Sequence, residues 1–516
     1  MSKYITKSLF VNYCTSPQLA WWAIHDKKWV FQQIQEANYG SMDGLAIGEE
    51  VEQAVLKLLE WKDIATVSSE DLDFLNRYQS YYSRTQEVLT ENPEIIYQPS
   101  FVVDGLFCKS DLLVKNEQWT YDLREVKAKS SVRKKTKDAP LLDDMVSDIS
   151  FQHYILTRTL WDKYSGKCFF VHLNKEYVKQ WPIDYDQLII KDEVTQEIMT
   201  DGHIEQLLIS LKECFVLSKE ELDKKFPYAS GDYLTYYGKS TPEWSVFNIP
   251  RIWRSLPNFV EQNKMFINDL DENDVMNLMT KKWAPTATSQ YVELRKQWKQ
   301  TIVDKQLVVE ELNTLQFPLY FYDYETVSTP VPVFEGSSPR QQVVVQYSCH
   351  RIDEDGTITH TESLIKNSEN ENKRIIEQLV SDLNNWKQWS YVVRYKWFEN
   401  SRNKELAEQY PEYAEALLAI NEKTFDLMEI FSKLYYFDKR FKGSSSIKKV
   451  LPVLTDISYA NLAVNNWSIA AQILWKLAKG EVDSNDIEEV TANLLEYCKQ
   501  DTWAMVAIYR KLQEVG

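Results

Sequence analysis

Hydrophobic residues recur with helical spacing in several stretches of the chain. The spacing is clear in SDISFQHYILTRTLW, in NKRIIEQLVSDL and in a long segment near the C-terminus. It is clearest in GEEVEQAVLKLLEW, where the i, i+3, i+4, i+7, i+8 positions are Val51, Ala54, Val55, Leu58 and Leu59. These segments are predicted to be amphipathic helices that each bury one face.

Apolar runs typical of strands lie between these helices. FVV and LFCKSDLLV flank the two-residue turn Asp104-Gly105, which predicts a hairpin, and the strands WTYDLREVKA and CFFVHL follow. A second group of runs consists of FPLYFYDYETV, VVVQYSCHRI, TITHTESLI and SYVVRY. Since helices and strands are mixed along the whole chain, an α/β fold is predicted.

The pattern divides the chain into three parts. Residues 1–215 contain the first group of strands, and residues 312–516 contain the second group in the order β-β-β-α-β-α. Between them, residues 216–311 are predicted to be a mainly helical connector, including the whole stretch ATSQYVELRKQWKQTIVDKQLVVEELNTL. The element order of the third part is that of an RNase H-like mixed sheet.

Composition and charge narrow the functional classes. The 516 residues carry a net charge of −17, which argues against indiscriminate coating of nucleic acid but is compatible with metal sites built from carboxylates. The six cysteines form no CxxC pair. No apolar run approaches the length of a membrane helix, and the N-terminus lacks a signal-peptide pattern. We therefore expect a reduced, cytoplasmic protein without a membrane partner.

The first candidate site lies at the end of WTYDLREVKA. Side chains alternate along a strand, so Glu125 and Lys127 share one face, and Asp111 on the preceding strand is placed to converge with them. Two carboxylates and a lysine suit cleavage of phosphodiesters with Mg²⁺ or Mn²⁺. Gln152 falls on the buried side of the next helix. The alternative is a solvated ion pair between Glu125 and Lys127 and a hydrogen-bonded core amide at Gln152.

DLLV, LREVKAKS, DISFQHYIL and HLNKEYV together resemble the RecB-like branch of the PD-(D/E)XK nucleases, with a restriction-endonuclease-like core. The resemblance implies Asp111 and Glu125 as metal ligands, with Lys127 and Gln152 in catalytic positions. The family often adds an acid or His from its first helix, for which Glu49 is the candidate here. Relatives often hold an iron–sulfur cluster, but the matching cysteines are missing, so no cluster is expected.

The second candidate site joins the two ends of the third part. In FYDYET, Asp323 and Glu325 lie on one strand face, and LLEYCKQDTWAM places Tyr497 and Asp501 at i, i+4 on one helix face. This pattern resembles the DEDDy subgroup of the DnaQ-like 3′–5′ exonucleases. The resemblance implies four carboxylates around divalent ions and a tyrosine that orients water.

The remaining carboxylate of that site departs from the family pattern. The family expects a sequence similar to HNxxFD after the fourth strand, and this chain has YKWFE, which makes Glu399 the positional candidate. Asp426 in KTFDLMEIF is the alternative.

The third part as a whole resembles bacterial domain of unknown function family 2779, whose members commonly carry a RecB-like nuclease upstream. The resemblance rests on FYDYET, PRQQVVVQYSCH, FENSRNKELA, GSSSIKKVLP and LEYCKQDTWAM. We therefore expect a metal-dependent nuclease with DNA favoured over RNA as substrate and a separate helicase or other DNA-processing protein as partner. The alternative is a nucleic-acid-binding or scaffold protein in which at least one of the two sites has decayed.

Overall fold

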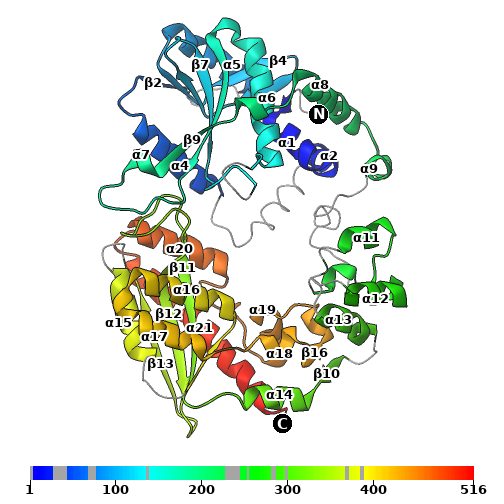
Figure 1. Cartoon of the computed structure of the whole chain (residues 1–516), viewed down its shortest axis with the longest axis vertical. Coiled ribbons are helices and arrows are strands. Elements are labelled where there is room, and N and C mark those ends of the chain that lie inside the picture. Colours follow the sequence, from blue (N-terminus) through cyan, green and yellow to red (C-terminus); the bar gives the residue numbers. More distant parts are fainter. Residues whose placement is uncertain are drawn as a thin grey trace. The chain divides into compact units, whose positions relative to one another are not determined.

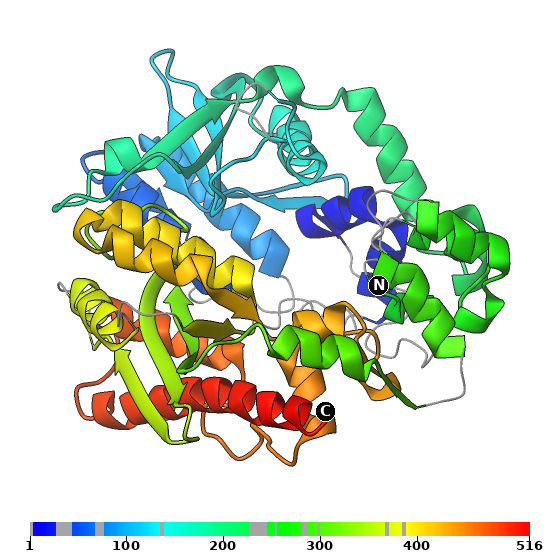
Figure 2. The same ribbon diagram turned by 60° about the horizontal axis from the view of Figure 1, so that its bottom comes forward.

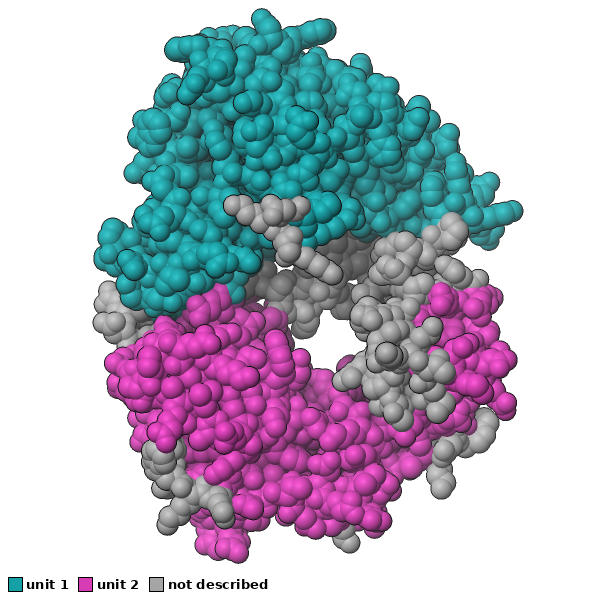
Figure 3. Space-filling view, in the orientation of Figure 1, with its two compact units in different colours: residues 1–39, 43–236, 330–340 teal, residues 40–42, 237–329, 341–516 magenta. Residues whose placement is uncertain are grey.

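The chain divides into two compact units. The computed structural model describes residues 4–26, 44–67, 77–134, 139–226, 245–250, 252, 255–280, 286–296, 300–366, 371–383 and 389–515. Unit 1 comprises residues 1–39, 43–236 and 330–340, and unit 2 comprises residues 40–42, 237–329 and 341–516 (Figure 3). Both units combine helices with mixed or antiparallel sheets, which confirms the α/β prediction (Figure 1). Among the described helices, none is long and apolar enough to cross a membrane.

Unit 1 is built on a six-stranded sheet and a smaller three-stranded one. The large sheet has the order β2-β3-β6-β7-β8-β9, in which β7 is antiparallel to β6 and parallel to β8. The small sheet has the order β1-β5-β4. The strands are β1 (Ile5–Thr6), β2 (Ile64–Thr66), β3 (Ile95–Tyr97), β4 (Ser100–Val103), β5 (Leu106–Lys109), β6 (Leu112–Lys115), β7 (Tyr121–Lys127), β8 (Tyr164–Leu173) and β9 (Ile189–Glu193).

Helices cover both faces of the large sheet. The apolar stripe of α4 packs with Val126 of β7 in one core, whereas Leu123 of β7 belongs to a second core that includes Phe10 of α1 and Ile149 of α6. Alternation along β7 therefore directs Glu125 and Lys127 toward α1 and α6. The helices are α1 (Lys7–Thr15), α2 (Pro17–His25), α4 (Gly44–Leu58), α5 (Arg77–Glu91), α6 (Asp143–Thr159), α7 (Tyr185–Leu188), α8 (Asp201–Cys214) and α9 (Lys219–Lys225).

The predicted hairpin at Asp104-Gly105 is confirmed as β4–β5, but the prediction that LFCKSDLLV forms one strand is wrong. The chain leaves β5 after Lys109 and enters β6 at Leu112, so the two halves belong to different sheets. Ser110 and Asp111 lie at the crossing, where the Asp111 carboxylate accepts a hydrogen bond from the backbone N–H of Val126 at 2.7 Å. The carboxylate thus replaces a strand partner at this position.

Unit 2 contains a five-stranded sheet with the order β13-β12-β11-β14-β15. β11 pairs antiparallel with β12 and parallel with β14. α21 packs along β11 and β12 on one face of the sheet (Figure 2). On the other face, side chains of β12 and β11 donate hydrogen bonds to side chains of α15 and α16. The strands are β10 (Thr301–Val303), β11 (Leu319–Val327), β12 (Val343–Ile352), β13 (Ile358–Leu364), β14 (Ser390–Val393), β15 (Thr424–Asp426) and β16 (Tyr436–Asp438).

Residues 301–303 depart from the predicted helical pattern. They form β10, which pairs antiparallel with β16, because the β-branched Thr-Ile-Val triplet suits a strand. The helices of unit 2 are α11 (Leu256–Glu261), α12 (Glu272–Thr280), α13 (Thr286–Lys296), α14 (Lys305–Leu312), α15 (Glu371–Leu383), α16 (Lys396–Gln409), α17 (Ala414–Glu422), α18 (Glu429–Ser432), α19 (Ile447–Leu454), α20 (Trp467–Lys479) and α21 (Ile487–Gln513).

The chain between β11 and β12 is unusual because residues 330–340 belong to unit 1. The backbone of Lys179 exchanges hydrogen bonds of 2.9 Å with Gly336 and Ser337. Arg340 donates to the carbonyl of Ala128 at 2.6 Å. Unit 1 is therefore assembled from segments that are distant in the sequence.

Two adjacent leucines of α17 provide a test of the unit 2 packing. Leu417 is fully buried and Leu418 is 43% exposed. We expect Leu417→Ala to lower the free energy of unfolding by about 2–5 kcal/mol, because it leaves a cavity. Leu418→Ala should change it by no more than about 0.5 kcal/mol. Urea unfolding measures both variants, and equal effects would contradict the packing of α17.

Candidate functional site

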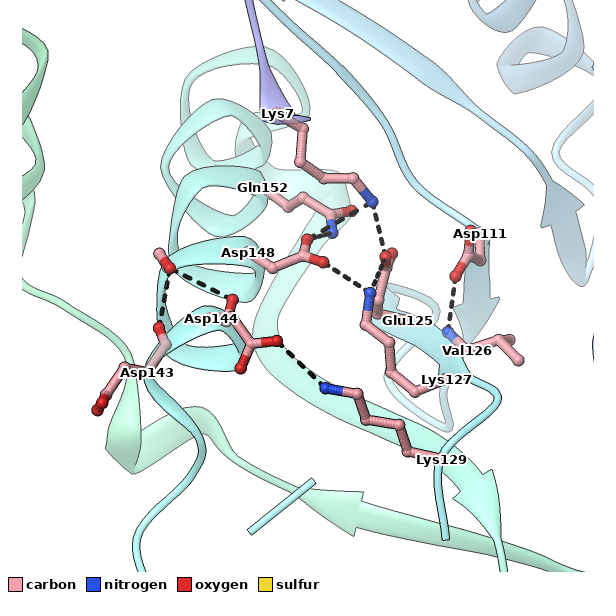
Figure 4. Close-up of polar contacts among 11 residues, drawn as sticks. Lys7, Asp111, Glu125, Val126, Lys127, Lys129, Asp143, Asp144, Asp148 and Gln152 are labelled. Atoms are coloured by element: carbon pink, nitrogen blue, oxygen red, sulfur yellow. Dashed lines mark hydrogen bonds and ion pairs between the residues drawn. The ribbon is translucent and has the colours of Figure 1, made fainter. Parts of the chain in front are cut away.

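The first acidic cluster lies in unit 1, where three elements meet (Figure 4). β7 supplies Glu125 and Lys127 from one face of the strand. α6 supplies Asp148 and Gln152, which are one helical turn apart and both buried. α1 supplies Lys7 from its first turn. Sequence reasoning named neither Lys7 nor Asp148 as a site residue.

These side chains form a network of charged hydrogen bonds. Glu125 Oε1 accepts from Lys7 at 2.6 Å and from Lys127 at 2.9 Å. Asp148 accepts from Lys127 at 2.6 Å and from Gln152 at 2.7 Å. Glu125 Oε2 and Gln152 Oε1 are buried and have no hydrogen-bond partner among the described residues. Because an unpaired buried oxygen is costly, these two atoms are available for a ligand.

The neighbouring charges shift the pKa values of Glu125 and Asp111 in opposite directions. Burial favours the neutral form of Glu125, but Lys127 and Lys7 hold the pKa of its carboxyl well below the ordinary value. Burial, together with the charge of Glu125, raises the pKa of Asp111 to about 8. Glu125 is therefore the charged acid, and Asp111 is the group that a nearby cation would deprotonate.

Glu49 is not brought to this cluster. It is exposed on α4, which covers the sheet face opposite Glu125. Three residues further along α4, Glu52 accepts hydrogen bonds from Tyr97 at 2.6 Å and from Gln98 at 3.3 Å. The charge of Glu52 contributes to the raised pKa of Asp111. Glu52 is therefore the α4 acid that acts on the cluster.

The second acidic cluster lies in unit 2 at the junction of the central strands with α16 and α21. Asp323 and Glu325 share one face of β11, and α21 brings Tyr497, Cys498 and Asp501 against that face. All of these side chains are at most 2% exposed. Ligand atoms of Asp323, Glu325 and Cys498 lie within 4.8 Å of one another, the only such group of three among the described residues. The structure thus brings together the two ends of the predicted site.

Arg394 occupies a central position in this cluster. It follows β14 directly, and its Nη2 and Nε lie 2.9 and 3.2 Å from the two carboxylate oxygens of Asp323. Its Nη1 lies 3.6 Å from Asp501 Oδ2, while Asp501 Oδ1 accepts a hydrogen bond from Tyr459 at 2.6 Å. Sequence reasoning missed Arg394 and Tyr459. The one signal for Arg394 was a charge placed directly after the apolar strand SYVV.

Of the two candidates for the remaining carboxylate, Glu399 joins the cluster and Asp426 does not. Glu399 is 1% exposed and lies within hydrogen-bonding reach of Asp323. Asp426 accepts hydrogen bonds of 3.0 Å from the backbone N–H groups of Lys396 and Met428. Asp426 therefore caps the start of α16, the helix that carries Glu399.

Burial and mutual repulsion dominate the electrostatics of the second cluster. Burial and the neighbouring acids raise the pKa of Asp323 to about 6 and that of Glu399 to about 9, and they raise the pKa of Glu325 strongly, although Arg394 opposes all three shifts. Burial, followed by the charge of Asp501, also raises the pKa of Tyr497. Tyr497 is therefore a neutral hydroxyl able to donate a hydrogen bond.

The donor set of this cluster fits a divalent cation. Four buried carboxylate oxygens and one hydroxyl accept no hydrogen bond among the described residues: Asp323 Oδ2, Glu325 Oε1, Glu399 Oε2, Asp501 Oδ2 and Tyr497 Oη. Two of these oxygens, on Asp323 and Asp501, have the guanidinium of Arg394 beside them. Carboxylate oxygens are the ligands that Mg²⁺ and Mn²⁺ take in proteins. A metal ion would satisfy the others.

A large pocket in unit 2 opens onto this cluster. Its volume is about 1550 Å³, and Glu325, Arg394 and Glu399 are among the residues that line it. Two aromatic side chains of its wall, Tyr395 and Trp397, are 57% and 68% exposed, and their rings lie 6.1 Å apart. The wall also carries lysines, serines and further acids, among them Lys396, Lys404, Lys433, Ser444, Asp426 and Glu429. The pocket is large enough for several units of a polymer.

A family model matches part of unit 2. Residues 320–446 match the family described as Domain of unknown function (DUF2779). The match covers less than half of the chain. The matched region includes Asp323, Glu325, Arg394 and Glu399, whereas Tyr497 and Asp501 lie beyond its end.

Similar curated proteins carry no assigned activity. "Uncharacterized protein MG366" of Mycoplasma genitalium is 30% identical over 224 residues, which cover 39% of this chain and 33% of that protein. "Uncharacterized protein UU173" of Ureaplasma parvum is 27% identical over 228 residues, which cover 39% of this chain and 32% of that protein. The chain thus spans about a third of the length of the curated relatives it matches. No solved structure matches it.

The raised pKa of Glu399 predicts how stability depends on pH. Between the ordinary value near 4.5 and the folded value of about 9, the folded chain retains a proton that the unfolded chain releases. The stability of the metal-free protein should therefore fall as pH rises from 5 to 9. Glu399→Gln, which imitates the neutral acid, should flatten this fall and raise the melting temperature at pH 8 by about 2–4 °C.

Thermal unfolding in the presence of a chelator measures this effect. Glu415→Gln on α17 is the matched control, because Glu415 is exposed. It should reproduce the pH dependence of the wild type. An unchanged slope in Glu399→Gln would show that Glu399 is already ionised in the folded chain.

Proposed function

We propose that the protein is a metal-dependent nuclease that hydrolyses phosphodiester bonds of nucleic acid. The observation that carries the proposal is the convergence of four acids in unit 2 with unpartnered buried oxygens. Asp323 and Glu325 come from one strand, and Glu399 and Asp501 come from two separate helices. Burial of several acids is unfavourable unless they are protonated, paired or bound to a cation, and Arg394 contacts only two of the four.

The topology of each unit supports a specific fold within this proposal. The order β13-β12-β11-β14-β15, with antiparallel pairs on one side of β11 and parallel pairs on the other, agrees with an RNase H-like, DnaQ-type sheet. The pairing of β7 with β6 and β8, with Glu125 and Lys127 at the end of β7, agrees with a PD-(D/E)XK core. Under this proposal the chain carries two candidate nuclease centres.

The residues of the unit 2 centre have separable roles. Glu325, Asp323, Glu399 and Asp501 would hold Mg²⁺ or Mn²⁺, and such an ion would supply activation of water for attack on a phosphodiester. The neutral Tyr497 hydroxyl would orient the attacking water by donating or accepting a hydrogen bond. Arg394 places a fixed positive charge beside Asp323 and Asp501, where it can stabilise negative charge on the phosphate.

In the unit 1 centre, Asp111 and Glu125 would hold the metal ion. Lys127 contacts Glu125 and Asp148, so its ammonium can position water or stabilise developing charge next to these acids. Gln152 would contribute its unpartnered Oε1 to the ion or to the water. Lys7 holds Glu125 from the opposite side and keeps it ionised.

The unit 2 pocket supports nucleic acid as the substrate class. Exposed aromatic rings such as Tyr395 and Trp397 can stack on bases, and lysines such as Lys396 and Lys404 can contact phosphates. The proposed substrate is DNA in preference to RNA. The proposed partner is a separate helicase or other DNA-processing protein. The relatives that match this chain are longer than it is, so the proposal is made for this chain and not for the whole of those proteins.

One observation favours a second candidate, a binding or scaffold protein. Each cluster already contains basic side chains among its acids, Lys7 and Lys127 in unit 1 and Arg394 in unit 2. A site that is neutralised internally can be stable without metal. Such a protein would bind nucleic acid in the pocket without cutting it.

A nuclease assay with Mn²⁺ on end-labelled single-stranded DNA, double-stranded DNA and RNA separates these candidates. Lys127→Ala should reduce cleavage by unit 1 at least about 100-fold, the scale of the loss when a reacting group is displaced. Lys129→Ala is the control, because Lys129 is exposed and pairs with Asp144 at 3.2 Å instead of with Glu125. It should cleave as the wild type does.

Glu325→Gln tests unit 2 in the same assay. It should reduce cleavage by unit 2 at least about 100-fold, since it removes a buried ligand charge while preserving shape. Glu354→Gln makes the same chemical change at an exposed turn of the same sheet and should have no effect. Cleavage that survives in the double variant Lys127→Ala, Glu325→Gln would contradict both assigned centres. Binding without any cleavage by the wild type would favour the scaffold.

A further inference from the structure

Arg394 lies where two of the unit 2 acids could share a metal ion. Its guanidinium contacts both oxygens of Asp323, at 2.9 and 3.2 Å, and lies 3.6 Å from Asp501 Oδ2. Asp323 comes from β11 and Asp501 comes from α21, so the arginine bridges the two elements on which the centre is built. A planar guanidinium binds carboxylates in this forked manner and stays charged at any pH of interest.

We infer that Arg394 takes the place of one divalent cation, so that the unit 2 centre binds a single metal ion. This inference rests on the proposed function, because it concerns how the same acids are neutralised. It departs from the pair of ions, about 4 Å apart, that a site of four carboxylates can hold. The second positive charge of the centre is then part of the protein.

The oxygens that remain available are consistent with one ion position. Asp501 Oδ1 accepts a hydrogen bond from the hydroxyl of Tyr459 at 2.6 Å, and Asp501 Oδ2 has the positive charge of Arg394 at 3.6 Å. Glu325 Oε1 and Glu399 Oε2 have no partner among the described residues. Ligand atoms of Glu325, Asp323 and Cys498 lie within 4.8 Å of one another, so this part of the cluster is compact. An ion held by Glu325 and Glu399 would use oxygens that Arg394 does not contact.

A second ion bound between Asp323 and Asp501 would have to displace the guanidinium. Arg394 is only 22% exposed, and the charges of Asp323, Asp501 and Glu325 stabilise its charged form. A divalent ion within a few ångströms of a retained guanidinium would also be repelled by it, and this repulsion is poorly screened in a buried site. Removal of the arginine charge should therefore open the second position.

Direct counting of bound Mn²⁺ tests the inference without measuring activity. All variants carry Glu125→Gln, which removes a buried ligand charge and should weaken Mn²⁺ binding by unit 1, so that the coupled pair reports on unit 2. Titration calorimetry gives the number of ions per chain, and electron paramagnetic resonance detects the coupling between two adjacent Mn²⁺ ions. We expect one ion and no coupling with Arg394 present, and two coupled ions in Arg394→Gln.

Two further variants serve as controls. Arg394→Lys keeps the positive charge and should still bind one ion. Arg351→Gln removes a surface arginine that pairs with Asp353 at 2.6 Å and should also leave the number at one. Thermal unfolding of each variant without metal verifies that the chain is folded. If Arg394→Gln does not fold, two coupled ions in the chain with Arg394 or in Arg394→Lys would still overturn the inference, and Arg394→Met then replaces Arg394→Gln as the uncharged variant.

The possible failures are distinguishable. Two coupled Mn²⁺ ions in the chain that retains Arg394 would overturn the inference and leave the proposed function standing. One ion or none in folded Arg394→Gln would also overturn it, because the arginine would then not be excluding a cation. No Mn²⁺ in any folded variant would instead overturn the proposed metal centre of unit 2 itself.

Discussion

The interaction on which both clusters depend is the pairing of buried acids with basic side chains of the same chain. A carboxylate removed from water must be neutralised, hydrogen-bonded or protonated. In unit 1, Glu125 stays ionised between Lys7 and Lys127, and in unit 2, Asp323 is held by Arg394. The acids beside them, Asp111 and Glu399, have raised pKa values because too few cations reach them. Each cluster is thus neutralised only in part.

The contacts that neutralise these acids also join the elements that carry them. Lys7 ties the start of α1 to the end of β7, and Arg394 ties the end of β14 to β11 and α21. Asp426 fixes the start of α16 through backbone hydrogen bonds, and so holds Glu399 in place. The same contacts that reduce the cost of burial therefore set the positions of the ligand atoms. Positioning of this kind is what metal-dependent chemistry requires.

The parts of the sites that follow local periodicity could be predicted from the sequence. Alternation along β7 and β11 placed Glu125 with Lys127 and Asp323 with Glu325, and the four-residue spacing in α21 placed Tyr497 with Asp501. The contacts that depend on tertiary structure could not be predicted. Lys7 reaches Glu125 across 118 residues and Arg394 reaches Asp323 across 71 residues, and neither separation leaves a pattern in one sequence. Asp148 differs from these two residues, because it lies four positions before Gln152 and so shares a helix face with it, which the sequence shows.

The placement of residues 330–340 has a consequence for any attempt to divide the protein. These residues join β11 to β12 within unit 2, yet they bond to the backbone of unit 1 next to Lys179 and Ala128. A single cut between residues 237 and 311 would separate a C-terminal fragment that still carries a piece of unit 1. The N-terminal fragment would lack that piece and would leave the backbone groups of Lys179 without their partners. One cut in the chain therefore does not yield two intact units, and a separated unit 1 would need residues 330–340 joined to it by another route.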